Sequence, residues 1–267
     1  MGGLVGWAFL NRTLDRQSAA FEASSEVKRD TEYFAETIGE IDTAEQLVSD
    51  RRLLSVALGA FGLEDDIDNR FFVRKMLEEG TIAADSFANR MADDRYKAFS
   101  KAFGFGDFDT PRTKLSYFAD EIIGQYQEHA FEVAVGDQDE TLRLALNAQR
   151  ELATMAEEAI ADGTEDDTMW FRVMGNKPLR EVFEVALGLP SSFGQLDLDV
   201  QLETFRDKSA RQLGHGEISQ FADPEAIEKL VQRYLVRTQM EEVQTTSAGA
   251  VALTLLQSAA STGNGLL

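Results

Sequence analysis

The sequence predicts an all-α protein built as an irregular multi-helix array. Through most of the 267 residues, apolar side chains recur at spacings of three and four, which is the period of an amphipathic helix. Only four prolines interrupt this pattern, and alternating strand patterns bounded by turn signals are missing. A typical globular protein is about one-third helix. This pattern instead predicts that more than about two-thirds of the residues are helical.

Local signals mark where several helices begin. Thr43 and Gln46 have the spacing of a capping box, in which each side chain satisfies a free backbone amide of the first turn. The pairs Thr110-Pro111 and Asp223-Pro224 place a capping side chain before a proline, which is favoured at the first helical position. We therefore expect helices to open at these three places and another to follow Asp139.

Three similar segments each end at a glycine, namely residues 53–59, 98–104 and 182–188. In each segment a short apolar helix is expected to stop at a glycine in the left-handed conformation. Two interpretations stay open: three similar helix ends, or duplicated helical-hairpin modules. The segments are unequally spaced, so they do not form a regular repeat protein.

The composition divides the chain into three parts. A small-residue and acidic stretch at 161–167 is the best linker candidate. We expect an N-terminal helical subdomain at 1–160, a C-terminal helical subdomain at 165–242 packed on the first, and a partly helical tail at 243–267. This tail contains no charged residue, and neither do residues 1–11.

The charge balance excludes some partners. There are 47 Asp and Glu against 26 Lys and Arg, which gives a net charge of −21. Nucleic acid and anionic lipid both attract basic surfaces, so we expect neither as a partner. The acidity either keeps the protein in solution or attracts a basic partner. No stretch has the ~18 consecutive apolar residues of a membrane-spanning helix, and the N-terminus lacks the basic stretch of a secretory signal.

No catalytic, cofactor-binding or metal-binding motif is present. Cysteine is absent, and the two histidines, His129 and His215, are interpreted as an ordinary helix residue and a turn residue. The acidic stretches at 66–70, 137–139 and 197–199 lack the glycine and glutamate of a calcium loop, so we interpret them as helix caps. An enzyme with an acidic active site stays the alternative, because 47 acids guarantee some close carboxylate pairs. A small-ligand or metal sensor is a third interpretation.

The uncharged tail carries the predicted partner-binding residues. Residues 248–260 are expected to form a helix with an apolar stripe that includes Ala252, Leu255, Leu256 and Ala259. A helix of about 13 residues is marginal in water, so it needs a surface to pack against. That surface is the protein's own core, a second copy or another protein.

Several stretches resemble the domain of unknown function 1217 family, which is found mainly in alphaproteobacteria. They are GWAFL at 6–10, RDTEYF at 29–34, DRRLLSVALGAFGL at 50–63, VGDQD at 135–139 and LGLPSSFG at 187–194, within roughly residues 5–237. The resemblance implies a helical fold and no established activity, and its members are often encoded among flagellar genes. It therefore implies a non-enzymatic interaction or structural protein associated with the flagellum. Such a protein would be cytoplasmic, or exported without a cleavable signal, and would have a protein partner.

Overall fold

The computed structural model describes the backbone of residues 2–262 and the side chains of residues 2–243. The chain is 77% helical, which confirms the expected all-α class and exceeds two-thirds. The described residues form twelve α-helices and no strand. None of these helices has the length and apolar content that crossing a membrane requires.

The helices are joined by short turns and 3-10 segments. The α-helices are α1 (Gly3–Glu22), α2 (Ser25–Thr37), α3 (Ala44–Ser49), α4 (Arg51–Gly59), α5 (Arg70–Glu79), α6 (Asp94–Phe103), α7 (Phe118–Gly136), α8 (Glu140–Asp162), α9 (Asp166–Gly175), α10 (Lys177–Leu187), α11 (Leu198–Gln212) and α12 (Pro224–Thr262). The 3-10 segments are η1 (Ile38–Glu40), η2 (Glu64–Asp66), η3 (Ala88–Arg90), η4 (Arg112–Lys114), η5 (Phe193–Gln195) and η6 (Ile218–Ala222).

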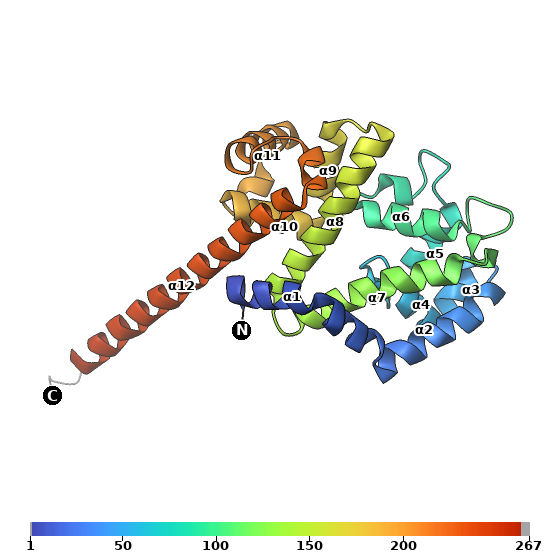
Figure 1. Ribbon diagram of the computed structural model, residues 1–267, viewed down its shortest axis with the longest axis horizontal. Coiled ribbons are helices and arrows are strands. Elements are labelled where there is room, and N and C mark those ends of the chain that lie inside the picture. The colour runs from blue at the N-terminus through green and yellow to red at the C-terminus, as the bar shows by residue number, and fades with distance from the viewer. Residues whose placement is uncertain (1, 263–267) are drawn as a thin grey trace.

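Two hydrophobic clusters form the core. The first cluster contains side chains from helices α2–α6 and from the start of α7, among them Phe34, Leu54 and Phe103. The second joins α1 and the end of α7 to α8–α12, around Trp170, Phe183 and Leu230. Figure 1 shows these two groups of helices on opposite sides of the body, with α7 and α8 running between them. Because α7 contributes to both clusters, it connects the two halves.

Several predicted helix ends are confirmed. Thr43 and Gln46 form the capping box, and Asp139 accepts a hydrogen bond from the Leu142 amide. Gly104 and Gly188 are left-handed caps, with φ of 67° and 64°. The prediction for Gly59 is wrong, because this residue is the last of α4 and Gly62 takes the left-handed conformation instead. A Cβ on Gly59 would lie 2.9 Å from the Tyr126 ring, so close approach requires glycine here.

The helix expected to begin at Pro111 is also placed differently. Pro111 is extended, the short segment η4 follows it, and α7 begins only at Phe118. Tertiary contacts hold this region: the buried Thr113 hydroxyl donates to the Ile41 carbonyl at 2.7 Å, and the Lys114 ammonium donates to the Gly39 carbonyl at 2.8 Å. These contacts compete with the helix that the local sequence favours.

The predicted linker is the turn between α8 and α9. Asp162 ends α8, and Gly163 follows it with φ of 64°. The division of the chain into two subdomains at this turn stays a prediction.

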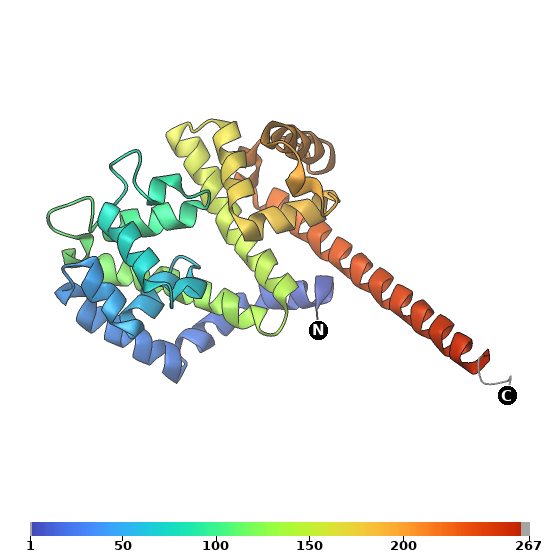
Figure 2. The same ribbon diagram turned by 180° about the vertical axis from the view of Figure 1, so that it is seen from behind.

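The last helix, α12, is 39 residues long and begins at Pro224 as expected. Its first part packs against α8 and α10 and buries Leu230, Val231 and Leu235. It also packs against α1, where the Trp7 indole donates to Glu228 at 3.1 Å. Figures 1 and 2 show the rest of α12 extending away from the body as a projecting rod. The helix expected at 248–260 lies within this rod, whereas the side chains of Ala252, Leu255, Leu256 and Ala259 lie outside the described residues.

Candidate functional site

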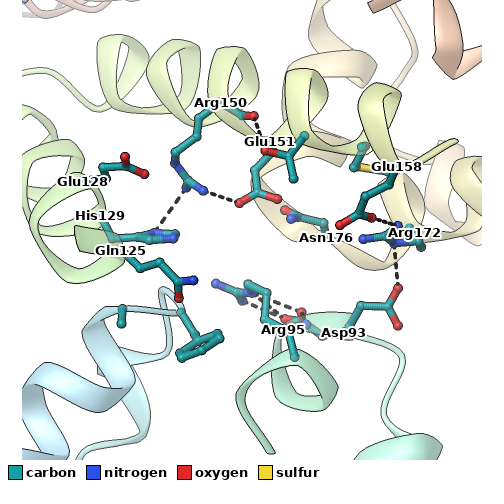
Figure 3. Close-up of a pocket in the computed structure, with 16 residues that line it drawn as sticks. Asp93, Arg95, Gln125, Glu128, His129, Arg150, Glu151, Glu158, Arg172 and Asn176 are labelled. Carbon is teal, nitrogen blue, oxygen red and sulfur yellow. Dashed lines mark hydrogen bonds and ion pairs between the residues drawn. The ribbon is translucent and has the colours of Figure 1, made fainter. Parts of the chain in front are cut away.

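A polar cleft lies where the two halves of the body meet. It consists of two adjoining hollows of about 380 and 490 Å³, and Arg95, His129, Glu151 and Asn176 line both of them. Figure 3 shows the first hollow, whose side chains come from α6, α7, α8 and α9 and from the turn after α4. Ligand sites in proteins have comparable volumes and often lie between structural units. This cleft is therefore the best-formed candidate site among the described residues.

A buried ion pair stands at the back of the cleft. Arg150 of α8 donates from Nε to the Glu132 carboxylate of α7 at 2.7 Å, and from Nη1 to Glu151 at 2.7 Å. Glu132 is only 6% exposed, and it also accepts from the Asn147 amide at 3.3 Å. Burial opposes the charge on Arg150, but the hydrogen bonds and negative charges of Glu132 and Glu151 together outweigh it and raise the Arg150 pKa. The pair thus ties α7 to α8.

His129 lies next to this pair and is electrically neutral. Its Nδ1 lies 3.3 Å from the Arg150 Nη2. Burial, and then the positive charges of Arg150 and Arg95, lower the His129 pKa to about 3. Because the guanidinium can only donate, Nδ1 accepts the hydrogen bond and Nε2 carries the proton. A base with so low a pKa takes up protons poorly near neutral pH, so His129 is not suited to general acid–base catalysis.

The other two arginines of the first hollow are also paired. The Arg95 guanidinium donates three hydrogen bonds of 2.7–3.1 Å to the Asp93 carboxylate and one to the Gly62 carbonyl. Arg172 of α9 donates to Glu158 of α8 at 2.7 Å and lies 3.2 Å from Asp94 of α6. The Arg95–Asp93 pair lies within the start of α6, whereas the contacts of Arg172 link α9 to α8 and α6 across the hollow (Figure 3). Their arrangement connects α6, α8 and α9 rather than presenting a free nucleophile.

Two of the three acidic stretches that resemble calcium loops supply helix caps, whereas the interpretation is wrong for 66–70, where no side chain caps α5. Asp139 and Asp197 accept hydrogen bonds from backbone amides at the starts of α8 and α11. Asp66 accepts from the Tyr96 hydroxyl at 2.7 Å. Within the described part of the chain, no group of three or more His, Asp or Glu side chains is arranged to hold a metal ion.

The partner-binding residues predicted from the sequence do not line the cleft. Ala252, Leu255, Leu256 and Ala259 belong to the projecting part of α12, and their side chains are not described. The sequence analysis missed the cleft, because His129 and Arg150 are 21 residues apart and meet only when α7 packs on α8. One available signal was the acid Glu132 between the apolar residues Phe131 and Val133.

Exposed apolar side chains gather where α12 leaves the body. Val236, Met240 and Val243 follow one another at helical spacing, and Val243 is 68% exposed. On α1, Leu4, Val5 and Phe9 are exposed as well. The start of α1 lies beside this part of α12, because a Cβ on Gly3 would overlap the Gln239 side chain. Exposed apolar patches of this kind are typical of protein interaction surfaces.

Comparison with known proteins places the chain in a family. Residues 60–227 match the family described as "Protein of unknown function (DUF1217)". The fold is similar to the crystal structure of protein AGR_C_984 from Agrobacterium tumefaciens, with a TM-score of 0.72 and 26% identity over 89% of this chain and 93% of that one. No curated protein matches the sequence. The match covers more than half of the chain, which therefore belongs to the DUF1217 family of proteins of unknown function.

Proposed function

We propose that the protein is a non-enzymatic interaction or structural protein, associated with the flagellum, that binds a protein partner through the projecting part of α12. One observation carries this proposal. The helix continues well beyond the body, over a stretch in which residues 243–262 include no charge. A helix without charged side chains is poorly stabilised by water alone and is stabilised more by a surface to pack against.

The sequence pattern of α12 indicates which side would bind. At 3.6 residues per turn, each residue advances the helix by about 100°. On that spacing, the apolar positions of the projecting part fall on the same half of the helix as the positions that are buried in the body. The former are Ala248, Ala252, Leu255, Leu256 and Ala259, and the latter are Ile227, Leu230, Val231, Tyr234 and Leu235. The face that packs on α8 and α10 thus continues past the end of the body.

The expected binding energy is moderate. Burying two leucines contributes roughly 3–6 kcal/mol before the cost of ordering the partner. That contribution favours a multivalent or assembled partner over a single tight contact. The flagellar association rests on the family resemblance, since members are often encoded among flagellar genes. A cytoplasmic protein and one exported without a cleavable signal are both compatible with this proposal.

Truncation after Gln244 tests the proposal. Because the helix has left the body by this point, we expect the melting temperature of the shortened protein to stay within about 2 °C of the full chain. Partner capture from cells that build flagella should be lost. Melting temperatures measured at two protein concentrations show whether the tail binds a second copy or another protein. A melting temperature that depends on concentration in the full chain but not in the shortened one would indicate a second copy as partner. A large fall at both concentrations would mean that the tail stabilises the body, and the proposal would be wrong.

A further inference from the structure

The second hollow of the cleft is strongly acidic. Its lining residues include eight Asp or Glu and three Lys or Arg. The 3-10 segment η2 lies on one side, and α7, α8 and α10 contribute the other acids. His129 adds no charge near neutral pH, since burial lowers its pKa to about 3. The hollow thus has an excess of negative charge.

Several of these carboxylates make no close ion pair, although the charge of Glu64 still acts on Arg95 and Arg143. Within the described part of the chain, Glu64, Asp65, Asp137 and Glu181 form no ion pair with a Lys or Arg. By contrast, Glu132 and Glu151 are paired with Arg150, and Glu140 is paired with Arg143. The unpaired acids belong to η2, the turn after α7, and α10, so they approach the hollow from three different elements.

A buried amide in the same hollow also lacks a partner. Asn147 of α8 is 7% exposed, and its Nδ2 donates to Glu132 at 3.3 Å. Its Oδ1 is buried and accepts no hydrogen bond among the described residues. A buried carbonyl oxygen without a donor is costly, and such atoms in proteins nearly always have a partner. Since an amide oxygen can only accept, the group that suits this position is an N–H or O–H donor.

The two observations define one kind of ligand. A bare metal ion would need several grouped ligands, and the described residues include no group of three or more His, Asp or Glu that could hold one. A protonated amine instead supplies up to three donors on one positive nitrogen, and several amines along a chain can reach separate carboxylates. A hollow of about 490 Å³ has room for such a molecule.

We infer that the second hollow binds a small organic cation with several protonated nitrogens, of the polyamine class, with Asn147 Oδ1 and the acids of η2 and α10 as acceptors. This site is separate from the projecting part of α12 and does not depend on the function proposed for it.

Isothermal titration of the full-length protein with spermidine tests this inference, at about 0.15 M salt so that diffuse attraction to the acidic surface is screened. We expect saturable binding at one site. The neutral chain 1,8-octanediol should not bind, and equimolar Mg²⁺ should not displace spermidine. Asn147→Ala removes the acceptor and should weaken binding about tenfold, the usual effect of losing one hydrogen bond to a charged group.

A second variant keeps the test valid if Asn147→Ala fails to fold. Glu64 and Glu181 are both exposed, so the double variant E64Q/E181Q should fold normally and bind spermidine about fivefold or more weakly. The matched control E36Q/E203Q removes two exposed acids outside the cleft and should change affinity less than about twofold. Absence of saturable binding would overturn the inference. Equal losses in both double variants would also overturn it, as would wild-type affinity in a folded Asn147→Ala protein.

Discussion

Glu132→Gln is expected to lower the free energy of unfolding by about 3 kcal/mol. The change keeps the shape of the side chain but removes the charge that balances Arg150. Both groups are largely buried, with side-chain exposures of 8% and 24%. Removing one partner of a buried ion pair leaves the other charge desolvated without compensation, which usually costs about 3–5 kcal/mol. Glu151 still contacts Arg150, so we place the effect at the lower end.

Urea denaturation measures this effect, and Glu151→Gln is the matched control. Glu151 contacts the same arginine but is 23% exposed against 8% for Glu132, so water screens its charge better and its loss should cost less, about 1 kcal/mol. If Glu132→Gln costs no more than this control, the pair does not hold α7 against α8 as described.

Trp170→Ala is expected to destabilise the protein by about 3–5 kcal/mol. Trp170 is fully buried in the second cluster, where it stacks on Phe205 with ring centres 5.6 Å apart and meets Phe183 edge-on at 5.2 Å. Its indole N–H also donates to the Gly216 carbonyl at 2.9 Å. Alanine would leave a large cavity and an unsatisfied carbonyl.

The next residue on the same helix provides the control. Phe171 is 41% exposed, so Phe171→Ala should cost less than about 1 kcal/mol. Thermal and urea unfolding of both variants compare the two positions directly. Similar losses at Trp170 and Phe171 would contradict the placement of Trp170 at the centre of the core.

Features set by neighbouring residues could be predicted from the sequence. The capping box of Thr43 and Gln46 closes within three residues, and the caps at Gly104 and Gly188 depend on the backbone freedom of glycine. The later start of α7, at Phe118 instead of Pro111, could not be predicted, because Thr113 and Lys114 bond to carbonyls more than 70 residues away. Tertiary contacts there outweigh local preference.

The cleft was hidden for the same reason. Glu132 and Arg150 are 18 residues apart on different helices, and Arg172 reaches both Asp94 and Glu158. No spacing along one helix brings these side chains together, so no motif marks them. The uncharged tail, by contrast, was visible in composition alone, although composition does not show that α12 continues straight out of the body.

The most direct test of the interaction proposal places equal charges on opposite faces of the projecting helix. Leu255→Glu/Leu256→Glu alters the predicted binding face, whereas Thr254→Glu/Gln257→Glu adds the same charge on other positions of the same turns. The wild-type protein and each variant are used as bait for affinity capture of partner proteins. The captures are made from lysates of the native cells and of a strain unable to build flagella. We expect the wild-type chain and the second variant to capture the same proteins from flagellated cells only, and the first variant to capture none of them. Equal capture by both variants, or the same proteins from cells without flagella, would contradict the proposed function.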